Sequence, residues 1–156
     1  MEQCGASDFA AGRRPEGFSL IEMMAVLVIA SVLYFVALPG YQHLLIKSGR
    51  AAARGTLLDV LARQEQHFVN NKRYATDLHD LGLPLPFYID AQAQAVETGR
   101  ATYRIDLDIR DGSYVGAVAV PLNRQSLDRE CMTFSLSHTG VRAVSGRALR
   151  EPARCW

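Results

Sequence analysis

The strongest constraint on this chain is an uncharged, mostly apolar run from Met23 to Ile46, which a single carboxylate, Glu22, precedes. A run of about 20 apolar residues is long enough to cross a bilayer as a helix. A charged side chain well inside such a run costs roughly 2.5–3.5 kcal/mol on insertion scales, and less near the ends. We therefore predict that this run forms a membrane-spanning helical segment. Glu22 then needs an interaction that offsets the free-energy cost of placing its charge at the membrane.

The residues before this run do not form an ordinary secretory signal. Residues 1–17 are short and polar and include Arg13 and Arg14. In a secretory signal the apolar core comes before the cleavage site, whereas here it comes after the candidate site, so cleavage would leave the helix on the mature chain. The alternative to such cleavage is that the apolar run is a plain N-terminal membrane anchor and residues 1–17 are its polar tail. Positive charges flank the run on both sides, so they do not decide its orientation.

Charge and cysteine content restrict the remaining choices. The chain has 156 residues and a formal net charge of +1, so it is one domain by length and its overall charge identifies no partner. Cys4, Cys131 and Cys155 make an odd number of cysteines, but removal of residues 1–17 would leave an even pair. If the C-terminal region lies outside the cytoplasm, a disulfide is favoured.

The helix is predicted to continue beyond the apolar run, from Phe18 to about Asn70. Leu57, Leu61, Gln64 and Phe68 fall on one face with helical spacing, so this second half is amphipathic. Pro39 is expected to bend the helix or to unwind it locally.

Four antiparallel strands are predicted after residue 100. Residues 103–109 and 131–137 alternate between apolar and polar side chains, and the Asp111–Gly112 pair predicts a hairpin turn between 103–109 and a strand over 114–120. A last strand is predicted over 141–144, and residues 74–100 are predicted to be a loop with one short helical turn. The expected fold class is α+β, with the long helix packed on a four-stranded antiparallel sheet.

The sequence shows no pattern of catalytic chemistry. The four histidines lack the spacing of metal ligands, and Asp106 and Asp108 lie on the polar face of an alternating strand, where solvation explains them. No phosphate-binding loop and no nucleophile–base pair is present. We expect no catalytic residue, no metal and no cofactor, and the chain is not expected to be an enzyme.

The junction from Gly17 to Glu22, followed by the apolar run and Pro39, closely resembles the class III leader junction of type IV pilins. The resemblance implies cleavage between Gly17 and Phe18 by a prepilin peptidase at the cytoplasmic face, and then N-methylation of Phe18. Glu22 and Pro39 match the family's glutamate and helix-bending proline. Glu16 departs from the pattern, because the family usually has Lys or Arg there.

Cleavage would give Glu22 a partner. It would create a positive amine on Phe18, and a carboxylate four residues along a helix lies one turn away. In a bundle of such helices Glu22 could pair instead with the Phe18 amine of a neighbouring subunit, which would set the register of assembly. The implied organisation is a leader over 1–17, a transmembrane and assembly half-helix over 18–46, and a periplasmic globular domain over 47–156.

Motifs along the rest of the chain look like those of PilE-type minor pilins of Gram-negative bacteria. They are Gly40-Tyr41-Gln42, Ala53-Arg54, Tyr74-Ala75-Thr76, Thr139-Gly140, Ser145-Gly146 and Cys155-Trp156. A bridge between Cys131 and Cys155 resembles the C-terminal disulfide loop of pilins. The resemblance implies a single-pass inner-membrane protein that later enters the pilus fibre. Its implied partners are the peptidase/methylase, other major and minor pilins, and the inner-membrane assembly platform.

Three functions are considered. The first is a minor pilin that helps to initiate pilus assembly and so serves twitching motility, adhesion and DNA uptake. The second is a type II secretion pseudopilin, which the arginine-rich, acid-poor C-terminal loop disfavours. The third, ranked below the first, is direct DNA binding, because residues 121–156 contain six arginines and three acidic residues and a basic stripe can bind phosphates. Its candidate contacts are Arg142, Arg147 and Arg150.

Overall fold

The computed structural model describes residues 18–156, without the side chains of residues 36–40. One long helix is followed by five strands and five short 3₁₀ helices. Their bounds are α1 (Leu20–Asn71), η1 (His79–Leu81), β1 (Phe87–Ile89), η2 (Thr98–Arg100), β2 (Tyr103–Arg110), β3 (Ser113–Pro121), η3 (Asn123–Leu127), β4 (Phe134–Ser137), β5 (Arg142–Val144), η4 (Arg147–Arg150) and η5 (Pro152–Arg154). The chain divides into two compact units, of which one ends at Pro39 and the other runs from Gly40 to Trp156.

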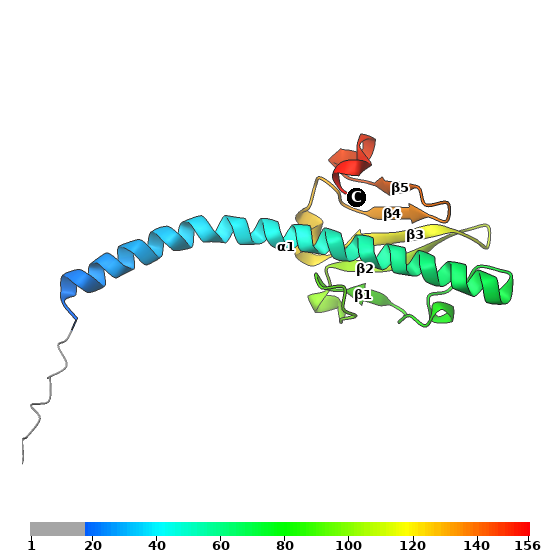
Figure 1. The fold of residues 1–156 in the computed structure, drawn as a ribbon, viewed down its shortest axis with the longest axis horizontal. Coiled ribbons are helices and arrows are strands. Elements are labelled where there is room, and N and C mark those ends of the chain that lie inside the picture. The colour runs from blue at the N-terminus through cyan, green and yellow to red at the C-terminus, as the bar shows by residue number, and fades with distance from the viewer. Residues whose placement is uncertain (1–17) are drawn as a thin grey trace, which may run out of the picture. The chain divides into compact units, whose positions relative to one another are not determined.

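The strands form one antiparallel meander in the order β1-β2-β3-β4-β5 (Figure 1). The α+β prediction is therefore confirmed, but the predicted number of four strands is wrong. The missed strand, β1, has only three residues and follows Pro84 and Pro86, so it is too short to show an alternating pattern. It exists because it pairs with β2, with Phe87 opposite Ile105, which is a tertiary contact that no local pattern reports.

The hairpin and the last two strands agree with the sequence analysis, with one correction. Asp111 and Gly112 have φ angles of 49° and 72°, the left-handed backbone that a tight hairpin turn requires. The strand predicted over 131–137 begins only at Phe134. Met132 has a positive φ of 54°, which interrupts the extended backbone after Cys131.

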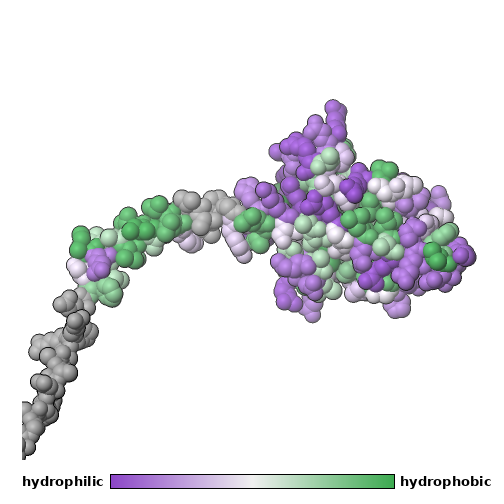
Figure 2. Space-filling view, viewed as in Figure 1, coloured by the Kyte–Doolittle hydropathy of each residue, from purple (hydrophilic) through white to green (hydrophobic). Residues whose placement is uncertain are grey.

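The helical assignment of α1 is continuous through Pro39, so the backbone is not locally unwound there. Within the described residues, no helix meets the length and hydrophobicity needed to cross a membrane. The membrane span predicted within 18–46 is therefore not confirmed. Considered by itself, the N-terminal part of α1 exposes large apolar side chains, including Leu20, Leu27 and Phe35 (Figure 2).

In the unit from Gly40 to Trp156, α1 lies across one face of the sheet (Figure 1). The helix buries Ala53, Leu57, Val60 and Gln64, which recur at the spacing of one helical face. The sheet supplies its inward-facing side chains, among them Tyr103, Ile105, Ala117, Ala119, Phe134 and Leu136. All residues of this core lie between Ala52 and Trp156, so a fragment from Gly40 onward keeps every core contact.

Gln64 shows how a polar side chain fits on this face. Its amide donates to the Ala75 carbonyl and accepts from the Ala75 N–H, both at 2.9 Å, so both ends of the buried group are satisfied. Leu57 and Gln64 thus lie in the core as predicted, whereas Phe68 is exposed and stacks on Tyr74 with ring centroids 4.7 Å apart.

Candidate nucleic-acid interface in the C-terminal region

The chain after β5 folds back onto the loop that precedes β4. The N–H of Arg147 donates to the Arg129 carbonyl at 3.0 Å, and the N–H of Gly146 donates to the Cys131 carbonyl at 3.2 Å. Position 146 must be small, because a Cβ there would lie 2.3 Å from the carbonyl oxygen of Glu130. Two arginine-bearing segments that are distant in sequence are therefore held side by side.

A disulfide between Cys131 and Cys155 fixes the same two segments. The Cα atoms are 5.8 Å apart, and both cysteines are buried. The structure thus contains the bond that the pilin resemblance implies. It anchors the C-terminal residues to the loop before β4, while Cys4 lies outside the described residues.

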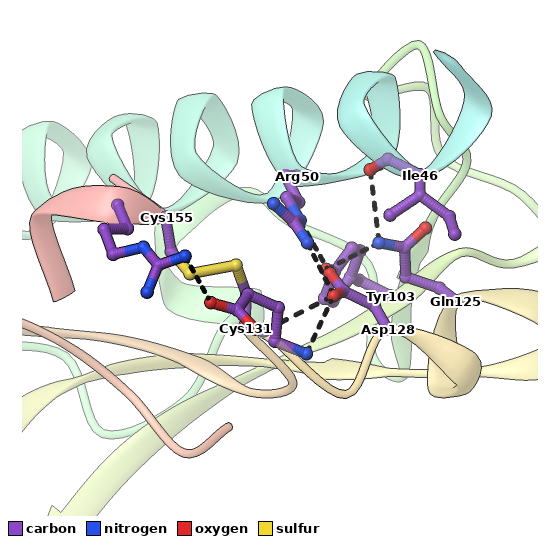
Figure 3. A network of polar contacts seen from close by, with 9 residues as sticks. Ile46, Arg50, Tyr103, Gln125, Asp128, Cys131 and Cys155 are labelled. Atoms are coloured by element: carbon purple, nitrogen blue, oxygen red, sulfur yellow. Dashed lines mark hydrogen bonds and ion pairs between the residues drawn. A yellow bond between two sulfur atoms is a disulfide. The ribbon is translucent and has the colours of Figure 1, made fainter. Parts of the chain in front are cut away.

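An ion pair connects this loop to α1 (Figure 3). Arg50 donates through both Nε and Nη2 to the two carboxylate oxygens of Asp128, at 2.7 Å each. The Asp128 side chain is only 2% exposed, and its Oδ1 also accepts the backbone N–H groups of Glu130 and Cys131 at 3.2 and 3.3 Å. The hydrogen bond to Asp128 raises the pKa of Arg50, so the guanidinium keeps its positive charge.

A second contact in Figure 3 joins η3 to α1 beside the ion pair. The Gln125 amide donates to the Ile46 carbonyl at 3.3 Å and to the Tyr103 hydroxyl at 3.1 Å. Burial raises the pKa of Tyr103 well above its usual value, so its hydroxyl stays protonated. Together these bonds give the C-terminal region a fixed position on the helix and sheet.

Four exposed arginines define what we call the C-terminal basic surface: Arg129, Arg142, Arg147 and Arg150. Within the described residues none of the four forms an ion pair, whereas Arg154 pairs with Glu130 at 3.2 Å and with Glu151 at 3.8 Å. The η4–η5 region that carries two of the four forms a hydrophilic projection in Figure 2. Cations that are free of carboxylate partners can bind an anion without first breaking an ion pair.

The structure brings some of the predicted contacts together. Arg147 and Arg150 are three residues apart in η4, and side chains at this spacing lie above one another in a 3₁₀ helix. Arg129 lies beside Arg147, because the Arg129 carbonyl accepts the hydrogen bond from the Arg147 N–H. Arg142 is separate on β5, where its guanidinium lies 5.5 Å from the centroid of the Trp156 ring. Trp156 is held in turn by a bond from its Nε1 to the Ala143 carbonyl at 3.0 Å.

The other predicted site residues precede the arginines of this surface by many positions in the sequence. Gly17 is outside the described residues, Phe18 is exposed, Glu22 lies in the first turn of α1, and Pro39 lies within α1. Asp106 and Asp108 do not pair with each other. Each binds an arginine of its own strand, with distances of 2.7 Å from Arg104 Nε and 2.9 Å from Arg110 Nη2.

The sequence analysis missed the Arg50–Asp128 pair. Asp128 lies in a polar loop and reads as a solvated acid, and its partner is distant in sequence. The available sequence signal concerned only the loop, because Asp is favoured in Asx turns, and Asp128 accepts the N–H groups of Glu130 and Cys131.

Comparison with known proteins assigns the chain to a family. A family model described as prokaryotic N-terminal methylation motif matches residues 12–33, which contain the Gly17–Phe18 junction and Glu22. A second model, described as type IV minor pilin ComP, DNA uptake sequence receptor, matches residues 39–135. The match therefore includes Arg129 but ends before Arg142, Arg147 and Arg150. A search of curated proteins found no match.

The second match covers more than half of the chain and all of β1 to β3. Its range begins within α1 and ends in β4, so it includes Cys131 but not Cys155. It also favours the type IV pilus over a type II secretion system, which was the second function considered. The chain belongs to the ComP family and is a type IV minor pilin involved in DNA uptake.

Proposed function

We propose that this minor pilin contributes to DNA uptake by binding DNA directly through the C-terminal basic surface. The observation that carries the proposal is the group of four exposed arginines without ion pairs, on a segment fixed by a disulfide and by backbone bonds. The sequence analysis ranked direct DNA binding below a role in assembly. The description of the matching family as a DNA uptake sequence receptor supports placing it first.

The chemistry of these side chains limits what they do. Guanidinium groups bind phosphate oxygens in a bidentate manner, and such contacts supply affinity and position the protein, but they do not read sequence. The proposal therefore assigns the C-terminal basic surface to the DNA backbone. Binding should weaken steeply as salt rises, because each neutralised phosphate releases counterions.

The test compares two triple variants of the fragment 40–156. Replacing Arg142, Arg147 and Arg150 by Ala should weaken binding to duplex DNA about equally for all sequences. The slope of log K against log salt should become shallower by roughly 0.9 for each lost phosphate contact. Fluorescence anisotropy over a salt series measures both quantities.

The matched control removes the same charge elsewhere, by replacing Arg63, Arg104 and Arg110, which are paired with Asp59, Asp106 and Asp108. Exposed pairs of this kind contribute about 0–1 kcal/mol to stability, so the control should remain folded. It should also keep most of its DNA affinity. If the two triple variants bind DNA equally, net charge alone explains binding and the proposed surface is wrong.

We also propose that the precursor is processed as the leader resemblance implies. Its leader suggests a membrane-anchored precursor in the inner membrane that later enters a pilus, with prepilin peptidase and other pilins as partners. Gly17→Val should block cleavage, because the peptidase must accept the residue before the cut, and the precursor should stay in the membrane. Intact-mass measurement decides: a mature Gly17→Val chain that begins with methylated Phe18 contradicts the assignment.

Glu22 is proposed to act in assembly by pairing with the amine of Phe18. Glu22→Val makes the segment more apolar, so membrane association and cleavage should persist, but the ionic partner is lost. We expect at least a severalfold decrease in the variant's share of sheared pili relative to cell-bound protein, measured by quantitative immunoblotting. Wild-type incorporation of Glu22→Val into sheared pili would rule out the pairing.

A further inference from the structure

A second basic site shares no residue with the C-terminal basic surface. It is a cavity of about 290 Å³ in the unit from Gly40 to Trp156. Its walls come from several segments: α1 contributes Leu45 and Ile46, the segment after β1 contributes Ala91, η2 and the residues after it contribute residues 99–102, and η3 contributes Arg124 and Leu127. The cavity thus lies where α1 enters this unit, and its size is at the lower end of small-molecule sites.

Hydrogen bonds hold the cavity walls together. The amide of Asn123 donates to the Thr98 carbonyl at 3.0 Å and to the Ala101 carbonyl at 2.8 Å, which joins η3 to η2. Gln125 joins η3 to the Ile46 carbonyl (Figure 3), and a Cβ at Gly49 would lie only 2.6 Å from Gln125 Oε1. Because these bonds join the wall segments before binding, a ligand has to order only the exposed side chains that it contacts.

The lining combines cationic and apolar groups. Arg100 and Arg124 are exposed, and neither forms an ion pair with any residue that the structure describes. No acidic residue is among the described side chains that line the cavity. Beside the arginines, the Leu127 residue is 67% exposed and lies on the same cavity as Leu45 and Ile46. The matching ligand is an amphiphile with a phosphate group.

DNA and phospholipid both carry phosphodiesters. The DNA backbone offers phosphate and sugar, and it would leave the apolar wall without a partner. Two residues of the apolar wall, Leu45 and Ile46, belong to α1, and the same helix exposes many large apolar side chains between Leu20 and Phe35. This combination favours a lipid over DNA.

We propose that this cavity binds the head group of an anionic glycerophospholipid, with the phosphate at Arg100 and Arg124 and the glycerol and first acyl carbons against Leu45, Ile46 and Leu127. The inference rests on the proposed membrane-anchored precursor. In that state the lipid would hold the globular unit to the membrane surface until the subunit leaves for the fibre.

The experiment uses the full mature chain, labelled with ¹⁵N and kept in a neutral detergent. Short-chain phosphatidylglycerol, phosphatidylcholine and glycerol phosphate are titrated separately, and amide shifts in residues 98–102 and 123–127 are followed. We expect saturable shifts with phosphatidylglycerol and much weaker binding of the other two probes. The variant Arg100→Gln/Arg124→Gln should lose affinity for phosphatidylglycerol by about 10-fold or more.

Two further variants separate this site from the DNA surface and from misfolding. Arg142→Gln/Arg150→Gln removes equal charge and should bind phosphatidylglycerol like wild type, whereas Arg100→Gln/Arg124→Gln should keep its DNA affinity. Leu127→Ser changes an exposed side chain, so the fold should persist while lipid affinity falls. Any of three results would overturn the proposal. Phosphatidylcholine could bind as tightly as phosphatidylglycerol, or Arg100→Gln/Arg124→Gln could keep the lipid affinity of the wild type. The third result is displacement of the lipid by duplex DNA, seen at the same amides. None of these results would bear on whether the C-terminal basic surface binds DNA.

Discussion

Asp128→Ala is expected to lower the unfolding free energy of the fragment 40–156 by about 3 kcal/mol. The substitution removes a carboxylate that is 2% exposed and leaves Arg50, itself 21% exposed, without its bidentate partner. It also leaves the N–H groups of Glu130 and Cys131 without the oxygen that accepts them. Because Arg50 retains some contact with water, the low end of the range for a broken buried pair applies. A fall in melting temperature of about 10 °C or more should be seen by calorimetry.

Asp59→Ala is the matched control, because it removes the acidic partner of Arg63 from an exposed pair on the same helix and should cost about 1 kcal/mol or less. The double variant Arg50→Met/Asp128→Leu should regain part of the loss, since replacing both charges by apolar groups leaves no unpaired ion. Equal destabilisation by Asp128→Ala and Asp59→Ala would show that the buried pair does not hold the C-terminal loop.

Loss of the disulfide should have an effect of similar size. Cys131 and Cys155 are 24 residues apart, and closing a loop of this length is worth about 3 kcal/mol in the chain-entropy model. In Cys131→Ser/Cys155→Ser we therefore expect a lower melting temperature and earlier proteolysis between η4 and Trp156. In the oxidised wild-type protein both thiols should resist alkylation until a reductant is added.

Reduction of the wild type gives an independent check on the same bond. The reduced wild type should melt at the temperature of the double serine variant or somewhat above it, because both lack the cross-link and the variant also places two hydroxyl groups at buried positions. Two freely alkylated thiols in oxidised protein isolated from the periplasm would refute the pairing.

The sequence predicted those parts of the fold that have a local pattern. The spacing of Leu57 and Gln64 placed them on the buried face of α1, and Asp111–Gly112 fixed the hairpin between β2 and β3. Strand β1 escaped detection because its three residues are extended only through pairing with β2. The start of β4 was misplaced because Met132 has a positive φ, which an alternating pattern of side chains does not reveal.

The candidate site shows the same division. An excess of arginines in the last 36 residues was visible in the sequence and led to Arg142, Arg147 and Arg150 as contacts. The sequence could not show which arginines lack an acidic partner, because this depends on tertiary contacts. Examples are the ion pairs of Arg154 with Glu130 and of Arg50 with Asp128. The cavity at Arg100 and Arg124 was likewise invisible, since its walls come from separate segments that only the fold brings together.

The most direct test of the central claim is DNA uptake by cells that carry this gene, measured as entry of fluorescently labelled duplex DNA. The variant with Arg142, Arg147 and Arg150 replaced by Ala should reduce uptake by about 10-fold or more if each lost contact is worth a charge-assisted hydrogen bond. The number of surface pili and the amount of the subunit in them should equal those of the wild type and of the Arg63, Arg104 and Arg110 control. Wild-type uptake by the first variant, with normal pili, would contradict the account and limit this minor pilin to a role in pilus assembly.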